Sequence, residues 1–146
     1  MELTEINKSF VRSSGQGFFG WIHREFAEEL TPEFLARMFA ERSLGSRPDS
    51  PGRGKVKRGV LPSGRVLIVR KFLRGGWARY LSQGLYVRLA CAGDSNYRPF
   101  QELRVLEHLH QKGVLVPKPA AAFVWPRAFG LAYRGLIATE ELEGAE

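Results

Sequence analysis

The chain has 146 residues, of which 44% are hydrophobic and 25% charged, and this length and composition are typical of one compact globular domain. Its single cysteine, Cys91, excludes an internal disulfide framework and a zinc site built from cysteines. Lys and Arg outnumber Asp and Glu by 22 to 15, so the formal net charge of +7 favours anionic partners.

The charge is unevenly distributed along the chain. Residues 42–88 contain twelve cations and a single acid, Asp49. Such a block attracts nucleotide phosphates, nucleic acid or an anionic membrane surface, and a solvated basic face is the alternative interpretation. Asp49 and Asp94 are the only aspartates, and both lie in loop-like sequence. Chemistry that needs two or three aspartates around a metal is therefore not expected from this chain alone.

The first element in chain order is a helix near residue 31. Residues 1–30 show no clear hydrophobic period, and we treat them as an N-terminal extension of a domain that covers residues 31–146. Thr31 followed by Pro32 is typical of a helix start, with threonine as N-cap and proline at the first helical position. The helix is expected to continue through about Ala40.

A β-hairpin follows. Gly64–Phe72 is a β-branched run that ends in two cations, and Lys55–Val60 precedes it. The sequence Pro62-Ser63-Gly64 predicts the turn between the two strands. Both strands come after a short segment that contains Gly52 and Gly54.

The second half of the chain predicts a helix and two further strands. The helix should run from Tyr97 to Gln111, capped by Ser95 or Asn96 and ended by Gly113. Two strands, at 121–124 and 131–138, are expected to be joined by a turn at 125–127. The predicted fold class is α+β, with an antiparallel sheet of about five strands, one main helix and the N-terminal helix.

Glu102 interrupts the apolar stripe of the predicted helix. At about 100° per residue it projects between Leu106 and Leu109, on the side that carries most of the helix's large apolar residues. A carboxylate on such a face requires a cation or several hydrogen-bond donors. Glu107 lies near the edge of the stripe, where we expect it to reach solvent.

The end of the strand at 64–72 offers the cation. Because side chains alternate along a strand, Lys71 shares a face with Val69, and Arg70 shares the other face with Ile68. Either cation could be the partner of Glu102, and both could instead mark an exposed strand end.

Three features occur in an order that suggests a nucleotide site. Gly52-Arg53-Gly54 would let backbone amides approach a phosphate, a strand-borne cation follows, and a helix-borne glutamate comes next. A lone Gly-x-Gly is more often a turn. In this order, however, the three features match the amino-terminal lobe of a protein-kinase-like fold.

Longer motifs resemble a known family. The segments 68–76 (with Arg-Gly-Gly at its end), 98–106, 113–122 (with Val-Pro-Lys-Pro) and 133–142 resemble those of the lipopolysaccharide kinases, the 3-deoxy-D-manno-octulosonic acid (Kdo) and heptose kinase group. The resemblance covers roughly residues 33–146 and is closer to the Kdo kinases.

The resemblance implies a function and a set of site residues. It implies phosphorylation by ATP of a Kdo residue in the lipopolysaccharide inner core, at the cytoplasmic face of the inner membrane. Carried over by position, Gly52, Arg53 and Gly54 belong to the phosphate loop, and Glu102 is the helix glutamate. Thr139 would lie behind the adenine, and Glu140 to Leu142 would form a hinge.

The identity of the strand cation stays open at this point. The Kdo-kinase pattern places an arginine at Arg70, whereas the heptose-kinase pattern favours Lys71. We slightly prefer Lys71, because a compact ammonium suits phosphate contact beside a glutamate.

The resemblance also implies parts that these residues do not supply. Kinases of this group place a catalytic aspartate and a magnesium-binding aspartate in a carboxy-terminal lobe after the hinge, and this sequence ends at Glu146. We therefore expect the ATP-binding lobe of a truncated or split chain, in which bound magnesium would need the other lobe.

The segment 73–94 mixes cations with aromatic residues. Its arginines, at 74, 79 and 88, could meet lipid A phosphates or an anionic membrane surface, with the aromatic rings at the interface. Two alternatives remain: a non-catalytic lobe that binds nucleotide or membrane, and a small basic nucleic-acid-binding domain.

Overall fold

The computed structural model describes residues 8–31, 34, 56–72, 86–87, 97–127 and 132–143. Most of the helix predicted over 31–40 lies outside these ranges. Thr31 Oγ1 nevertheless accepts a hydrogen bond from the Phe34 amide at 3.2 Å, which is the capping contact that the prediction requires.

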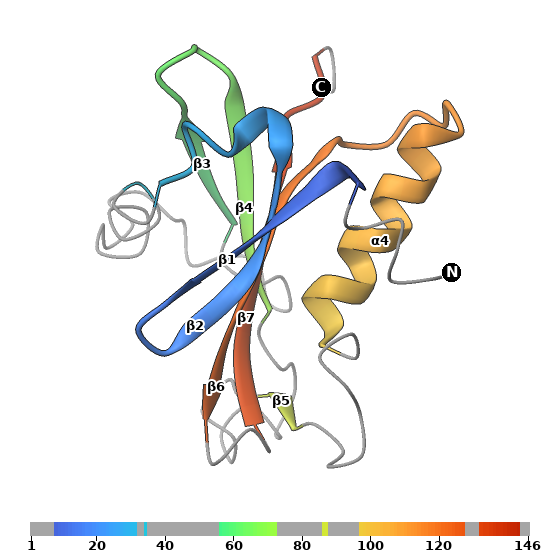
Figure 1. Ribbon diagram of the computed structural model, residues 1–146. Helices are drawn as coiled ribbons and strands as arrows, with labels where there is room; N and C mark the ends of the chain where they lie inside the picture. Colours follow the sequence, from blue (N-terminus) through green and yellow to red (C-terminus); the bar gives the residue numbers. More distant parts are fainter. Residues whose placement is uncertain are drawn as a thin grey trace, which may run out of the picture.

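The described chain forms one antiparallel sheet and one long helix (Figure 1). The strands are β1 (Phe10–Gly15), β2 (Phe18–His23), β3 (Val56–Val60), β4 (Val66–Phe72), β5 (Tyr86–Val87), β6 (Pro119–Arg127) and β7 (Ala132–Glu140), and the helix is α4 (Arg98–Gln111). The strand order is β1-β2-β6-β7-β4-β3, and β5 also pairs with β7. The predicted α+β class is confirmed, and the described residues contain seven strands rather than about five.

The hairpin predicted at 55–72 is confirmed. The strands β3 and β4 pair in antiparallel register, with Val60 opposite Val66. The Leu61 amide donates to the Arg65 carbonyl at 2.8 Å to close the turn. Gly64 adopts a φ of 88°, a backbone conformation that glycine reaches without steric cost.

The hairpin β1–β2 was not predicted. Its two strands join the edge of the same sheet, where β2 pairs with β6. Strand β2 is buried or half-buried at every position, so it lacks the alternation that marks a strand with one solvated face. A Cβ at Gly20 would lie 2.1 Å from the Ala122 carbonyl oxygen, so glycine permits the close approach of β2 to β6.

The turn predicted at 125–127 is wrong, because these residues continue β6. Trp125, Pro126 and Arg127 pair with residues 134, 133 and 132 of β7. The pairing of β6 with β2 stops at Val124. Pro126, which lacks an N–H, therefore lies where β6 has a ladder partner on only one side, a position that tolerates proline.

The N-terminus of α4 is held by strand β7 rather than by its own cap. Its N-cap is Tyr97, without a side-chain cap, so the caps predicted at Ser95 or Asn96 are wrong. The Tyr133 hydroxyl accepts a hydrogen bond from the Arg98 amide at 3.1 Å. At the other end Gly113, with a φ of 76°, follows the helix as predicted.

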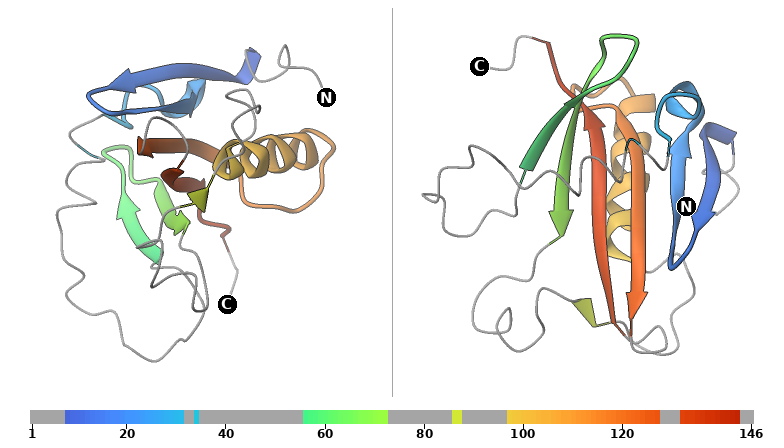
Figure 2. Two further views of the ribbon diagram at one scale, coloured as in Figure 1. Left: turned by 90° about the horizontal axis from the view of Figure 1, so that it is seen from below. Right: turned by 90° about the vertical axis from the view of Figure 1, so that its left-hand side faces the viewer.

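Each face of the sheet carries its own hydrophobic cluster. Helix α4 lies on one face (Figure 2), and residues 24–31, which follow β2, pack on the other. The cluster on the α4 face contains Phe10, Phe72, Tyr97, Phe100, Leu103, Ala122, Val124, Tyr133 and Ile137. The cluster on the opposite face contains Ile22, Phe26, Leu30, Leu61, Leu67, Val69, Ala120, Ala121, Phe123, Leu136 and Ala138.

We predict that Tyr133→Phe will destabilise the fold modestly. The substitution keeps the ring, which packs edge-on against Tyr97 at 4.8 Å, and removes the hydroxyl that accepts the hydrogen bond from the Arg98 amide. The expected loss is about 0.5–1.5 kcal/mol in the free energy of unfolding, measured by urea denaturation. Unchanged stability would show that this hydrogen bond does not anchor α4.

A second prediction concerns pH. Burial lowers the pKa of His23 below its ordinary value of 6.5, although the nearby carboxylates of Glu107 and Glu25 oppose this shift. Lys118 and His110 act in the same direction as burial. The unfolded chain therefore takes up the proton first, so the stabilising contribution of neutral His23 is complete above pH 6.5 and is lost as the pH falls through the folded pKa.

The urea midpoint should accordingly fall as the pH is lowered through 6.5, and His23→Gln should remove most of this slope. An identical slope in the wild type and in His23→Gln would assign the effect to other groups.

Candidate functional site

Arg70 of β4 and Glu102 of α4 form an ion pair between Arg70 Nη2 and Glu102 Oε1. Arg70 lies on the face of β4 that α4 covers, two residues before Phe72 of the α4-face cluster. Its guanidinium also stacks 5.3 Å from the centre of the Phe72 ring. The sheet and the helix thus bring together two of the predicted site residues.

This pair is partly exposed rather than interior. The Arg70 side chain is 45% exposed and that of Glu102 33%. An ion pair at such exposure contributes only about 0–1 kcal/mol to stability. The pair matters instead for orientation, because the Glu102 carboxylate holds one edge of the Arg70 guanidinium. The planar guanidinium carries several N–H donors, whose geometry is suited to phosphate oxygens.

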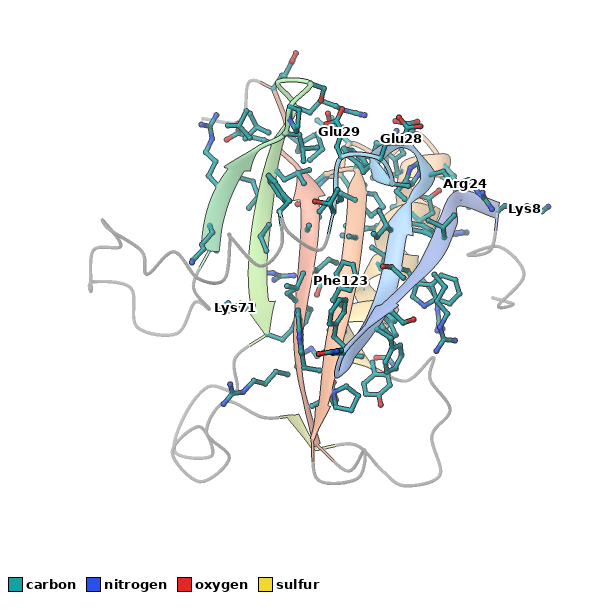
Figure 3. All side chains as sticks on the ribbon, turned by 60° about the vertical axis from the view of Figure 1, so that its left-hand side comes forward. Lys8, Arg24, Glu28, Glu29, Lys71 and Phe123 are labelled. Atoms are coloured by element: carbon teal, nitrogen blue, oxygen red, sulfur yellow. The ribbon has the colours of Figure 1, made fainter. Side chains whose placement is uncertain are left out.

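Lys71 lies on the other face of β4. It alternates with Arg70, and the residues of the same parity, Leu67 and Val69, belong to the cluster away from α4. Figure 3 labels Lys71 near the end of β4 and Phe123 on that face of the sheet. The structure therefore pairs Glu102 with Arg70, and the preference for Lys71 as the phosphate contact stays a prediction.

Glu107, not Glu102, is the buried carboxylate of α4. Its exposed fraction is 8%, so the expectation that it reaches solvent is wrong. Gln111 Nε2 donates to its Oε1 at 2.7 Å, and its Oε2 is buried without a hydrogen-bond partner. The sequence pattern missed this because the hairpin β1–β2, which packs near this side of α4, was not predicted.

The face of β3 and β4 beside the ion pair presents four apolar side chains, and the exposed Arg58, which pairs with Ile68, lies among them. Val56 lies opposite Arg70, and Val60 lies opposite Val66. Val56 is 53% exposed and Val60 57%, and Val66 and Ile68 are half-buried. We refer to Val56, Val60, Val66 and Ile68 as the β3–β4 shelf. Helix α4 packs mainly on β6 and β7, so it leaves this shelf open.

Thr139 lies beside the shelf, at the end of β7. It pairs with Ile68 of β4 and therefore shares the face that carries Arg70. It is half-buried. The structure thus places Thr139 on the same face as Arg70. Arg70 pairs with Ile137 of β7, and Thr139 follows Ile137 by two residues.

The predicted hinge is tied to the sheet. The Glu140 amide donates to the Lys118 carbonyl at 2.8 Å, and the Glu141 amide donates to the Val66 carbonyl at 2.9 Å. These two donors are therefore engaged within the protein. An adenine base that binds at the end of β7 would therefore need other backbone groups, such as those of Leu142.

Ion pairs reinforce the exit of β7. The Arg65 guanidinium binds both oxygens of Glu140, at 2.8 and 3.1 Å, and one oxygen of Glu25 at 3.3 Å. The hydrogen bonds that Arg65 donates to Glu140 raise the pKa of Arg65. Lys118 also donates to Glu25, and this bond lowers the pKa of the Glu25 carboxyl. Sequence reasoning missed this cluster because the paired residues are 40 to 93 positions apart in the chain.

A cleft of about 710 Å³ opens at this end of the molecule. Its walls are the β3–β4 turn, the segment 113–118 and the exit of β7, so it contains Glu140 and Leu142 of the predicted hinge. Arg70, Glu102 and Thr139 do not line it. The predicted site residues therefore occupy two zones along the sheet.

Several predicted residues fall outside the described ranges. Gly52, Arg53 and Gly54 are among them, as is the segment 73–94 apart from residues 86–87. Within the part of the chain that the structure describes, no helix is long and apolar enough to cross a bilayer. In the same ranges, no three His, Cys, Asp or Glu side chains gather to hold a metal ion.

Comparison with known proteins identifies relatives. Residues 49–146 match the lipopolysaccharide kinase (Kdo/WaaP) family. A 3-deoxy-D-manno-octulosonic acid kinase of Stenotrophomonas maltophilia is 34% identical over 122 residues, which cover 82% of this chain and 47% of the relative. A kinase of the same name from Xanthomonas oryzae is 34% identical over 121 residues, with 81% and 46% covered.

A third such kinase, from Actinobacillus succinogenes, is 39% identical over 77 residues, which cover 53% of this chain and 30% of the relative. The chain spans about half the length or less of these relatives. No solved structure matches. The resemblance seen in the sequence is confirmed, and the chain belongs to the lipopolysaccharide kinase (Kdo/WaaP) family.

Proposed function

We propose that this chain binds ATP for the phosphorylation of a Kdo residue of the lipopolysaccharide inner core. Family membership and the names of its relatives support the substrate class. The observation that carries the nucleotide site is the ion pair between Arg70 of β4 and Glu102 of α4. A strand cation positioned by a helix glutamate is the arrangement with which protein kinases hold nucleotide phosphates.

In this proposal Arg70 contacts the phosphates. Glu102 engages one edge of its guanidinium, and the neighbouring Phe72 ring supports the plane of the group. A guanidinium held in this way loses little further freedom when it binds phosphate oxygens, so more of the interaction energy becomes affinity. Its charge also offsets the negative charge on the transferred phosphoryl group.

In this proposal the adenine base of ATP packs on the β3–β4 shelf. Exposed valines on an otherwise ordered strand pair are suited to an aromatic ring system, which would remove them from water. The residue opposite Arg70 is Ile137, three residues before Glu140. Three residues of strand correspond to about 10 Å, which separates the phosphate end of the site from the end of β7.

The glycine segment fits the phosphate end. Strand β3 starts at Val56, directly opposite Arg70, and Gly54 precedes Val56 by two residues. Gly52, Arg53 and Gly54 thus immediately precede the strand end that lies beside Arg70. We retain their assignment to a phosphate loop as part of the proposal.

Magnesium is not assigned to residues of this chain. The described residues hold no group of acidic or histidine side chains that could bind a metal ion, and the two aspartates of the sequence lie outside the described ranges. The described residues therefore do not fit a magnesium site, and we derive no step through one.

The acceptor and its location extend the proposal. A Kdo residue on lipid A would bring the kinase to the cytoplasmic face of the inner membrane. The basic and aromatic segment 73–94 is the part of the chain whose composition fits an anionic membrane surface.

We predict that Arg70→Met will weaken binding of a non-hydrolysable ATP analogue by about tenfold or more, equivalent to about 1.4 kcal/mol. Glu102→Gln should weaken it less, by about three- to tenfold, because it removes only the group that orients Arg70. Lys71→Met is the matched comparison, since it removes the same charge from the opposite face of the same strand, and it should change the affinity by less than about threefold. Isothermal titration calorimetry measures all three.

The pattern of effects separates the alternatives. A loss confined to Lys71→Met would make Lys71 the phosphate contact, and silence of all three variants would refute the site. Transfer of labelled phosphate from ATP to Kdo-lipid A tests the activity itself. Nucleotide binding without transfer by this chain would favour the non-catalytic alternative.

A further inference from the structure

The hairpin β1–β2 packs against helix α4. It lies outside residues 49–146, the range that matches the family model. In Figures 1 and 2 the hairpin runs along the edge of the sheet nearest to the helix. The hairpin therefore adds an N-terminal element beside the family-matched part of the fold, and its contacts indicate what it does.

The first contact zone is at the N-terminal end of α4. The Phe19 ring of β2 lies 5.5 Å from the Tyr97 ring and 5.7 Å from the Phe100 ring. Trp21 packs against the same hydrophobic cluster, and Phe10 of β1 is buried within it at 1% exposure. Three aromatic side chains of the hairpin thus belong to the cluster that α4 covers, and Phe19 contacts the N-terminal end of the helix.

The second contact zone is at the C-terminal end of α4. Gln111 Nε2 lies 3.5 Å from Ser9 Oγ, next to the start of β1, and donates to the buried carboxylate of Glu107. The negative charge of Glu107 raises the pKa of His23 of β2, against the larger effect of burial. The His23 ring packs edge-on against Phe10 at 5.1 Å. The hairpin therefore contacts the helix near both of its ends.

Glu102 lies between these two zones. It follows Phe100 by two residues and precedes Glu107 by five, so its position depends on how both ends of α4 are held. A row of paired residues crosses the sheet from Trp21 through Ala122 and Ile137 to Arg70. The hairpin contributes Trp21 at one end of this row. Arg70, at the other end, forms the ion pair with Glu102.

The ion pair cannot fix the helix by itself, because both of its side chains are partly exposed. We propose that the hairpin β1–β2 is a built-in positioning element, which holds α4 where Glu102 meets Arg70, with Phe19 as its main contact. Its effect on nucleotide binding rests on the function proposed above, whereas its effect on α4 does not.

The matched variants are Phe19→Leu and Phe18→Leu in the 146-residue protein. The two phenylalanines are neighbours on β2 and both are half-buried. Phe18 points to the other face of the sheet, where its ring lies 5.8 Å from those of Phe123 and Trp125. The same substitution thus removes a contact with α4 in one case and a contact away from it in the other.

Hydrogen–deuterium exchange of residues 98–111 provides the first readout. Phe19→Leu should raise the exchange rate of α4 amides by roughly tenfold, while Phe18→Leu leaves it within about twofold of the wild type. Equal exchange of α4 in the two variants would overturn the proposal, because both variants lose a buried ring contact from the same strand.

Binding of the ATP analogue provides the second readout. Phe19→Leu should lower the affinity by about fivefold, and it should have no further effect in a Glu102→Gln background, because its influence passes through Glu102. An equal loss in both backgrounds would overturn the positioning role. A wild type that binds no nucleotide would refute the proposed function, while the exchange comparison would still decide whether the hairpin positions α4.

If Phe19→Leu does not fold, the unmodified protein supplies the test. Because coupling is reciprocal, the bound ATP analogue should slow amide exchange in β1 and β2 as well as in α4. Protection confined to β3, β4 and the end of β7 would contradict the proposal.

Discussion

The site depends on a meeting between strand β4 and helix α4 on one face of the sheet. Alternation along β4 places Arg70 on that face and Lys71 on the other, so the strand offers one cation to the helix. Glu102 of the helix forms an ion pair with this cation. Neither side chain is buried enough for the ion pair to stabilise the fold strongly, so the surrounding packing must create the geometry.

That packing includes contacts of the helix with strand β7 and with the hairpin β1–β2. Tyr133 of β7 accepts a hydrogen bond from the first turn of α4. A Cβ at Gly135 would lie 2.4 Å from Pro99 Cγ, so glycine allows the helix to lie directly on β7. The hairpin β1–β2 adds a further contact through Phe19, whose ring packs against those of Tyr97 and Phe100. The site is thus a surface feature held by buried contacts that lie around it.

Local chemistry explains which parts of the fold could be predicted. The β3–β4 hairpin followed from turn residues and a β-branched run, and the end of α4 followed from Gly113. Glu102 was found because it interrupts an apolar stripe. The choice between Arg70 and Lys71 as its partner could not be made, because alternation gives the two faces of a strand without saying which face the helix covers.

The failures share one cause: they depend on contacts between distant segments. The hairpin β1–β2 has no clear alternation because β2 is covered on both faces. The helical pattern alone predicts that Glu107 is solvated, whereas in the structure, with that hairpin nearby, it is buried. Arg65 holds Glu140 across 75 residues of chain, which no local pattern signals. The assignment of the glycine segment stays a prediction, because those residues lie outside the described ranges.

The most direct test of the central claim is a double-mutant cycle on the affinity for an ATP analogue, with Arg70→Met and Glu102→Gln alone and combined. If Glu102 acts by orienting Arg70, the double variant should bind no more weakly than Arg70→Met alone. Losses that simply add, or an affinity that neither substitution changes, would contradict the account.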